Sequence, residues 1–322
     1  MFHTSGNFFT CTLKCMKINI NIHDDLKGTR LDTIISAYGK SCSRAKANYF
    51  INHNHIIVNG LKKKPGYRVK TGDIISGIIP ETDINITISP ENIDLDIIFK
   101  DDHIMVINKK PGMVVHPAAG NMSKTLVNAL LFHDPAIKKS GDDLFRAGIV
   151  HRLDKDTSGL IVVARTNQAL LFLQKEFKQR RVKKQYLALV AGALSDNQGT
   201  INLPIGRHLK KRKIMAVNLE GGKHAITCWK IKNRFKTACL VKALLKTGRT
   251  HQIRVHFYAI DHPLIGDRVY QYRRYRKKNL APRQMLHSWQ LAFRHPYSGE
   301  KLSFIADPPE DFMQTISLFE SM

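Results

Sequence analysis

The stretch RAGIVHRLDKDTSGLIVVART, residues Arg146–Thr166, decides the fold of this chain because it sets a charged loop directly before a continuous apolar strand. Catalytic groups are often found on loops that rigid strands support. Asp154 and Asp156 lie among several cations, which favours one ionised carboxylate, acting as a nucleophile or base, over a pair that shares a proton. The alternative is a tight turn in which Asp and Thr side chains cap backbone groups.

A second motif, LLKTGRTHQIRVH at residues 244–256, combines a turn with a helix. We expect Thr250 to cap a helix over residues 250–260 that carries Arg254 one turn inside. Helix N-termini and nearby arginines attract anions, although a structural salt bridge is the alternative role for Arg254. His251 and His256 are five residues apart, which does not match the spacing of a helical zinc pair.

The composition favours a polyanionic partner. The 322 residues include 51 lysines and arginines against 26 aspartates and glutamates, a net charge of +25 that folding does not require. Basic clusters recur along the chain, and the segment 272–278 interleaves tyrosine with arginine, which suits phosphate contacts and stacking on unpaired bases. The residues therefore predict a nucleic-acid enzyme or binder.

The N-terminal part divides into short segments of different composition. Residues 1–15 lack an apolar leader pattern and are expected to be a disordered extension, and the folded protein is expected to begin at Met16. Residues 16–80 form a small basic module in which helical spacing predicts helices near 31–38 and 43–50, and Asn59-Gly60 predicts a hairpin turn. Residues 81–95 are acidic, contain Pro90, and are expected to be a linker.

The remaining chain, residues 96–322, has the pattern of a larger mixed domain. Strand-like runs alternate with helical stretches at 125–132, 167–180 and 250–260, and short polar turns join several of the strands. We therefore expect an α+β protein: a small α/β module followed by a mixed, largely antiparallel sheet.

Several classes of protein are not expected from the sequence. No apolar run approaches the ~18 residues of a membrane span. The five cysteines show no paired zinc spacing, and no nucleotide-binding glycine motif occurs, so we expect neither a metal nor a cofactor. Unpaired cysteines fit a reducing cytoplasm, and the high charge favours a monomer.

The motifs together resemble those of the RluA-type family of RNA pseudouridine synthases. The first motif matches the family signature in which the aspartate of HRLD is catalytic, here Asp154. KKQYLALV, residues 183–190, matches the motif with the active-site tyrosine, here Tyr186, and TGRTHQIRVH matches the motif with the basic partner, here Arg254. The resemblance implies a catalytic domain with a central RNA-binding cleft and an ion pair between Asp154 and Arg254.

The resemblance also implies how the protein contacts RNA. The target uridine leaves its stack, with Arg152 filling the vacated space and His151, Arg249 and His251 beside it. Residues 16–80 resemble an S4 RNA-binding domain through RLD, SRAKANYFI, IIVNG and GD, with phosphate contacts at Arg44, Lys46, Lys62 and Lys64.

Further segments narrow the resemblance to one branch of the family. MVVHPAAGN, PIGRHLKKRKIMAV and GGKHAIT are most similar to the branch that modifies clustered uridines in one stem-loop of 23S ribosomal RNA. The implied partner is 23S rRNA or a large-subunit precursor particle. The alternatives are the same chemistry on tRNA or at other 23S sites, and a non-catalytic ribosome-assembly factor.

Overall fold

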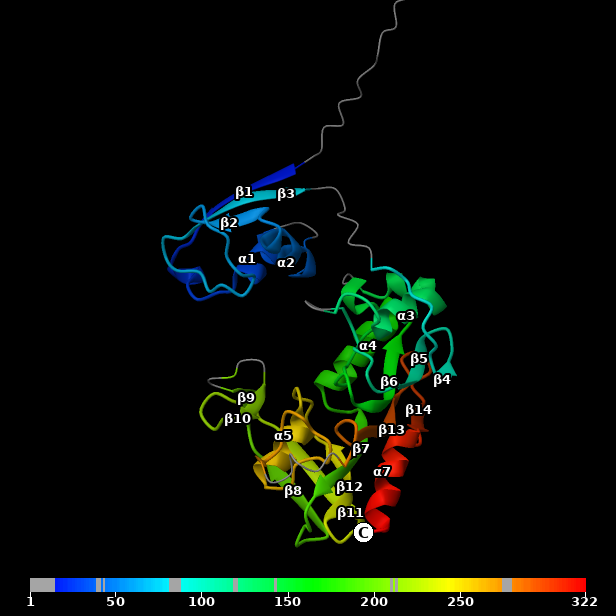
Figure 1. Ribbon diagram of the computed structural model, residues 1–322. Coiled ribbons are helices and arrows are strands. Elements are labelled where there is room, and N and C mark those ends of the chain that lie inside the picture. The colour runs from blue at the N-terminus through cyan, green and yellow to red at the C-terminus, as the bar shows by residue number, and fades with distance from the viewer. Residues whose placement is uncertain are drawn as a thin grey trace, which may run out of the picture. The chain divides into compact units, whose positions relative to one another are not determined.

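The computed structural model (Figure 1) divides into two compact units, residues 1–87 and 88–322. It describes residues 15–38, 42, 44–80, 88–117, 121–141, 144–208, 211, 214–273 and 280–322, without the side chains of residues 15, 44, 45 and 80. The extension predicted at 1–15 and the cap predicted at Ser43 therefore lie outside the described residues, apart from the backbone of Cys15.

The N-terminal unit packs two helices on a three-stranded antiparallel sheet of order β1-β3-β2. Its elements are β1 (Cys15–Asn21), η1 (Asp24–Leu26), α1 (Leu31–Tyr38), α2 (Arg44–Asn52), β2 (Ile56–Val58) and β3 (Ile74–Pro80). Ile18 and Ile20 alternate with polar residues on β1, and both are buried. Asn59 and Gly60 have φ angles of 52° and 72°, which confirms the predicted tight turn.

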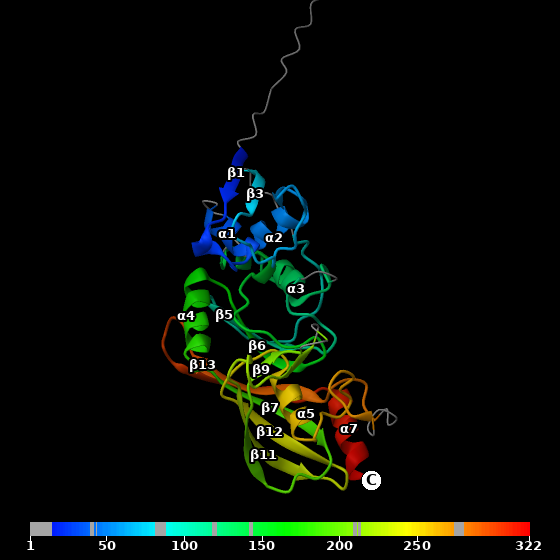
Figure 2. The ribbon, with the colours of Figure 1, turned by 90° about the vertical axis from the view of Figure 1, so that its left-hand side faces the viewer.

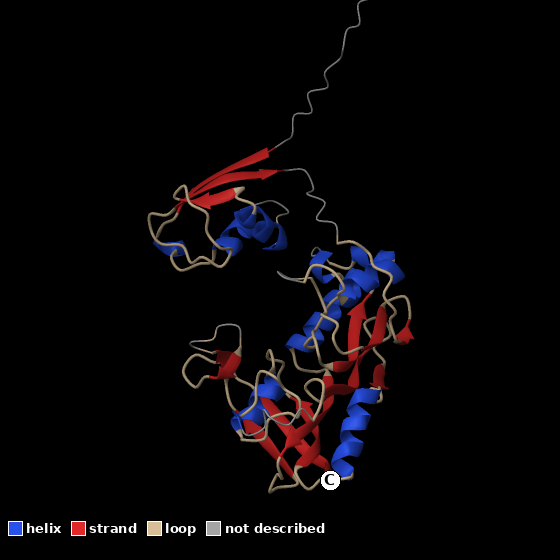
Figure 3. Ribbon diagram, viewed as in Figure 1, coloured by secondary structure: helices blue, strands red, loops and turns tan. Residues whose placement is uncertain are grey.

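The second unit is built on one large mixed sheet (Figure 3). The strand order is β4-β5-β6-β13-β7-β12-β11-β8, β14 pairs with β13, and only β6 and β13 run parallel among the described pairs. A mostly antiparallel α+β fold is thus confirmed. The elements are β4 (Ile97–Lys100), β5 (Ile104–Lys109), α3 (Leu126–His133), η2 (Pro135–Lys139), η3 (Leu144–Arg146), β6 (Ser158–Ala164), α4 (Asn167–Lys178), β7 (Lys183–Ala191), β8 (Gln198–Asn202), β9 (Ile205–Arg207), β10 (Met215–Val217), β11 (Ile226–Arg234), β12 (Ala238–Leu245), α5 (Gln252–Ala259), β13 (Leu286–Arg294), β14 (Lys301–Ile305) and α7 (Glu310–Glu320).

Helices cover both faces of this sheet (Figure 2). Alternate residues of a strand point to opposite faces, so Tyr186 and Ala188 of β7 join one core and Leu187 and Leu189 join another. The first core contains residues of α3 and α5, and the second contains Phe312 and its neighbours on α7. Helix α4 packs on Leu160 and Val162 of β6, which alternate with the residues that join the first core. Tyr186 therefore faces the side on which α5 lies.

Gly159 brings β6 and β13 together where the sheet branches. The N-terminal end of β13 pairs with β6, and its later residues pair with β14. Gly159 has a φ of 105°, and a Cβ atom there would lie 2.3 Å from the carbonyl oxygen of Ser288. Only glycine fits this approach, which also places Ser288 beside Tyr186 in the β13–β7 register.

Residues 88–95, in the segment predicted as a linker, belong to the second unit. Asn128 of α3 donates to the carbonyl of Ser89 and accepts from the amide of Glu91, and Nε2 of His133 lies 2.8 Å from the carbonyl of Ile93. These contacts hold the segment against α3. No described helix is long and apolar enough to cross a membrane.

Candidate active site

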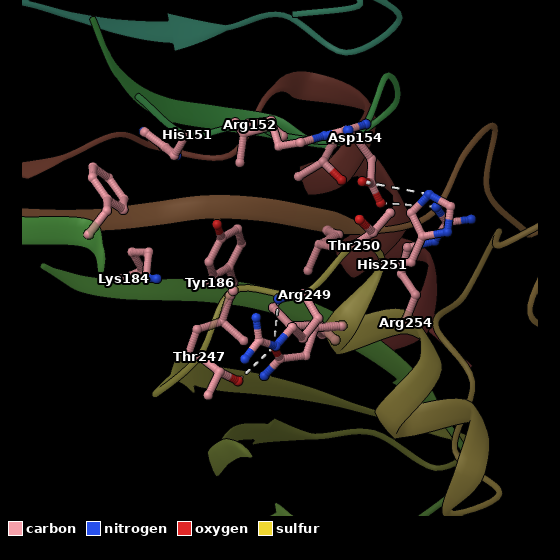
Figure 4. Close-up of a pocket in the computed structure, with 18 of the residues that line it drawn as sticks. His151, Arg152, Asp154, Lys184, Tyr186, Thr247, Arg249, Thr250, His251 and Arg254 are labelled. Carbon is pink, nitrogen blue, oxygen red and sulfur yellow. Dashed lines mark hydrogen bonds and ion pairs between the residues drawn. The ribbon is translucent and has the colours of Figure 1, made fainter. Parts of the chain in front are cut away.

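A pocket of about 460 Å³ lies where the loop before β6, strand β7 and the β12–α5 connection meet (Figure 4). All seven residues predicted for the active site and its RNA contacts in this unit line it: His151, Arg152, Asp154, Tyr186, Arg249, His251 and Arg254. Among the described residues that line the pocket, Asp154 is the one carboxylate. The pocket size is in the range of small-molecule sites.

The predicted ion pair between Asp154 and Arg254 is present. Nη1 of Arg254 donates to Oδ2 of Asp154 at 3.0 Å, and the Asp154 side chain is 17% exposed. Figure 4 shows Asp154, His251 and Arg254 on one side of the pocket, Lys184 on the other, and Tyr186 between them. The pair holds the carboxylate of Asp154 at the pocket wall.

Arg254 is held by a second aspartate, Asp267, which the sequence did not identify. Nε and Nη2 of Arg254 donate to the two carboxylate oxygens of Asp267 at 2.6 and 3.0 Å, and the Asp267 side chain is fully buried. Burial disfavours the charged guanidinium, but the hydrogen bonds and charge of Asp267, with Asp154, outweigh it and raise the pKa of Arg254. The guanidinium therefore stays charged and fixed in direction.

Asp267 is in turn fixed by backbone donors. Its Oδ1 accepts from the amides of Val269 and Tyr270, both at 2.9 Å. In the sequence, the signal for Asp267 was the Gly-Asp pair at 266–267. The structure requires the glycine, because Gly266 has a φ of 76° and a Cβ atom there would lie 1.9 Å from the carbonyl oxygen of Arg283. A glycine that a close backbone contact requires indicates a tightly packed loop rather than a turn exposed to solvent.

Tyr186 lies beneath the pocket on β7, opposite Ser288. Its ring is buried, and its hydroxyl is hydrogen-bonded with Ser288, whose own hydroxyl donates to the carbonyl of Leu160. Burial raises the pKa of Tyr186, and the charge of Asp154 raises it further. The phenol therefore stays protonated.

A buried lysine holds the loop that carries Asp154. Nζ of Lys109 donates to the carbonyls of Lys110, Met113 and Lys155 at 2.9 to 3.1 Å, so all three ammonium donors are used. Burial and the charge of Arg283 lower the pKa of Lys109 to about 7. Lys109, which the sequence did not single out, therefore fixes the loop through the carbonyl of Lys155.

The β12–α5 loop differs from the prediction at its cap. Thr250 was expected to cap the helix, but the N-cap is His251, with a φ of 56°. Gln252 organises this turn instead: its Oε1 accepts from Thr247 Oγ1 at 2.8 Å and from the amide of Arg249 at 2.9 Å. No side chain caps the first turn of α5, and Gln252 instead fixes the turn that precedes it. His251 turns toward Asp154, with 3.8 Å between its Nε2 and Oδ1.

The other predicted pocket residues differ in how firmly they are held. Arg152 is exposed. Nε of Arg249 donates to the carbonyl of His224 at 3.0 Å. His151 stacks on Phe177 with 4.6 Å between ring centroids, and its Nε2 accepts from the amide of Val162 at 3.0 Å. His151 therefore braces β6 as well as lining the pocket.

The pocket also contains cations that the motifs did not identify as site residues. Lys178, Arg180 and Lys184 line it, and Lys184 lies two residues before Tyr186 on the same face of β7. Burial and the charge of Arg180 lower the pKa of Lys184 to about 8. The signal in the sequence was the basic run 180–184 directly before the tyrosine.

The residues predicted as phosphate contacts in the first unit lie on α2 and on the turn after β2. Lys62 and Lys64 are exposed, whereas Lys46 is half-buried on α2. Arg44 begins α2, and its side chain lies outside the described residues.

Two family models match the chain. RNA pseudouridylate synthase matches residues 103–259, which contain Asp154, Tyr186 and Arg254, and the S4 domain matches residues 29–75. The N-terminal unit is thus an S4 domain, as the sequence predicted.

Individual relatives agree with the family models. The chain is 40% identical over 311 residues to the ribosomal large subunit pseudouridine synthase D of Nitrosomonas europaea, covering 95% of this chain and 88% of that protein. It is 39% identical over 301 residues to an uncharacterised RNA pseudouridine synthase of Bacillus subtilis, covering 93% and 97%. Among solved structures, human RNA pseudouridylate synthase domain containing 1 is 26% identical, with a TM-score of 0.55 over 71% of this chain and 96% of that one. The chain therefore belongs to the family of RNA pseudouridine synthases.

Proposed function

We propose that this enzyme isomerises clustered uridines in one stem-loop of 23S ribosomal RNA, with Asp154 as its catalytic carboxylate. The observation that carries the proposal is the Asp154–Arg254–Asp267 chain, which points one ionised carboxylate into a pocket otherwise lined by cations and uncharged groups. The substrate follows from relatives such as the synthase D proteins of Nitrosomonas and Neisseria meningitidis, whose names refer to the ribosomal large subunit.

The reaction is an isomerisation that balances without a cofactor. The bond between N1 of uracil and C1′ of ribose breaks, the base turns, and C5 bonds to C1′. The proton on C5 leaves and N1 gains one, so neither electrons nor other atoms are exchanged. Asp154 supplies the carboxylate that acts on the nucleotide as nucleophile or base, and Arg254 aims it.

The remaining pocket residues bind and orient the flipped nucleotide. The ring of Tyr186 stacks on the uracil while its phenol stays protonated. Arg152, exposed at the pocket mouth, fills the space that the base leaves in the RNA stack, where loop nucleotides lower the cost of flipping. His151, Arg249 and His251 line the path of the nucleotide.

Phosphate contacts extend to the S4 domain through Arg44, Lys46, Lys62 and Lys64. We propose that the partner is 23S rRNA or a large-subunit precursor particle, met by a monomer in the cytoplasm. The high positive charge supports this by favouring association with RNA over self-association.

The test is a map of pseudouridines. Unmodified 23S rRNA, precursor particles and tRNA are incubated with the enzyme and with Asp154→Asn, and pseudouridines are detected by carbodiimide-blocked primer extension. We expect stops in one 23S stem-loop that depend on Asp154. Stops only in tRNA or elsewhere in 23S rRNA would contradict the substrate, and RNA binding without stops on any of them would favour an assembly factor.

A further inference from the structure

Tyr270 contacts Arg254, Asp267 and His251, the three residues around Asp154, without lining the pocket. Its ring is 3% exposed and lies over the guanidinium of Arg254, with 4.9 Å from Cζ to the ring centroid. Its amide donates to Oδ1 of Asp267 at 2.9 Å. Its hydroxyl lies 2.8 Å from Nδ1 of His251. One tyrosine thus contacts both the cation that pairs with Asp154 and the histidine that faces it.

The hydroxyl of Tyr270 has a defined hydrogen-bond direction. It accepts from the amide of Met215 on β10 at 2.8 Å, so one of its lone pairs is used by a fixed backbone donor. Among the contacts of the described residues, Nδ1 of His251 is the acceptor beside its own proton. The phenol therefore donates to Nδ1, and the neutral imidazole carries its proton on Nε2.

The surroundings of the other ring nitrogen require the same tautomer. Nε2 of His251 faces Oδ1 of Asp154 at 3.8 Å, while Arg254 occupies Oδ2. A lone pair on Nε2 would point at the carboxylate, whereas an N–H stabilises it. Burial lowers the pKa of His251, with Asp154 partly opposing, so the ring supplies this N–H without a charge.

We propose that Tyr270 is a positioning residue that acts through His251. Its hydroxyl, held by the β9–β10 hairpin, keeps His251 in the tautomer whose Nε2–H faces Oδ1 of Asp154. The carboxylate is then oriented from two directions, by Arg254 on one oxygen and by His251 on the other. The inference rests on the proposed role of Asp154. It adds a chain of hydrogen bonds from Met215 through Tyr270 to His251, whose Nε2 lies 3.8 Å from Oδ1 of Asp154.

The test removes one oxygen atom. Tyr270→Phe keeps the ring over Arg254 and the amide bond to Asp267 but loses the donor to Nδ1. We expect kcat to fall roughly 10- to 100-fold, the usual effect of losing a partner that orients a site residue, with KM for RNA within about twofold. Tyr258→Phe, a change of the same kind on the neighbouring helix α5, is the control and should keep wild-type kinetics.

A double-mutant cycle separates positioning from stability. His251→Asn tolerates the positive φ and has no group at the Nε2 position, so Tyr270→Phe should have no further effect on kcat in that background. Multiplicative losses would overturn the inference. So would a lowered melting temperature of Tyr270→Phe with unchanged kcat, because that outcome assigns the hydroxyl to stability alone.

Asp154→Asn, measured alongside, distinguishes failure of the site assignment from failure of the proposed role of Tyr270. An inactive Asp154→Asn with a fully active Tyr270→Phe refutes only the role of Tyr270. An active Asp154→Asn refutes the site assignment and the positioning role with it.

Discussion

Two buried arginines, Arg254 and Arg283, hold the loop 151–157 from two sides, and they differ in what they offer the pocket. Each pairs with an aspartate through two nitrogens: Arg254 with Asp267, and Arg283 with Asp311 of α7. Arg254 gives its remaining nitrogen to the carboxylate of Asp154. Arg283 gives its remaining donors to backbone carbonyls, including that of Asp156, and to Ser158 Oγ.

At this loop, Arg254 contacts the carboxylate in the pocket, whereas Arg283 holds the backbone. A guanidinium that saturates backbone carbonyls fixes the path of the chain, whereas one that donates to a carboxylate in a pocket also fixes the direction of that carboxylate. The aspartates differ in the same sense, because the Asp267 side chain is fully buried and that of Asp311 is 29% exposed. Replacing Arg254 and replacing Arg283 should therefore have different effects on activity and stability.

The largest effect is expected for Arg254→Ala. The change leaves Asp267 buried without its partner and releases Asp154, so the free energy of unfolding should fall by about 3–5 kcal/mol and pseudouridine formation should nearly vanish. Thermal melts and single-turnover assays measure the two losses. An unchanged melting temperature together with an unchanged rate would contradict the pairing.

Arg283→Ala should affect stability more than chemistry. Asp311 is partly hydrated and regains water, so a loss of about 1–3 kcal/mol is expected, mainly from the unpaired carbonyls. The rate per folded molecule, measured well below the melting temperature, should fall far less than in Arg254→Ala. Equal losses of rate in the two variants would erase the distinction between the two arginines.

The sequence predicted the charged loop, its strand and the Asp154–Arg254 pair because contiguous motifs carry them. It did not single out Asp267 and Tyr270, because their roles depend on contacts from a loop that folds back over α5. The N-terminal half of strand β13 carries no apolar alternation. His287 and Ser288 are polar but buried, and bonds to Ser158 and Leu160 satisfy them. A period-2 apolar pattern cannot reveal polar residues that only tertiary contacts satisfy.

A smaller effect is expected from the pH dependence of Lys184. Its pKa is lowered to about 8, so its positive charge is present below that pH and lost above it, and KM for RNA should rise several-fold between about pH 7 and pH 9. Lys184→Arg stays charged and should flatten this profile. The free energy of unfolding should increase with pH, because a lysine whose pKa is lowered in the folded state contributes more stability as the pH rises from about 8 to 10.5. A wild-type profile in Lys184→Arg would place the titration elsewhere.

The smallest effect concerns the S4 domain. Replacing exposed Lys62 and Lys64 by alanine in the full chain should weaken RNA binding modestly. The slope of log affinity against log salt should become shallower by about one to two units, because each phosphate contact releases counterions. The rate at saturating RNA should stay at the wild-type level. An unchanged salt slope would mean that these lysines do not contact RNA phosphates.

The central claim is that the carboxylate of Asp154, held by Arg254, performs the chemistry. The most direct measurement compares single-turnover pseudouridine formation and RNA affinity for the wild-type enzyme and Asp154→Asn. The amide keeps the size of the side chain but not its charge, so the rate should fall by at least about 10³-fold while the dissociation constant changes less than about threefold. A rate near that of the wild type would contradict the account.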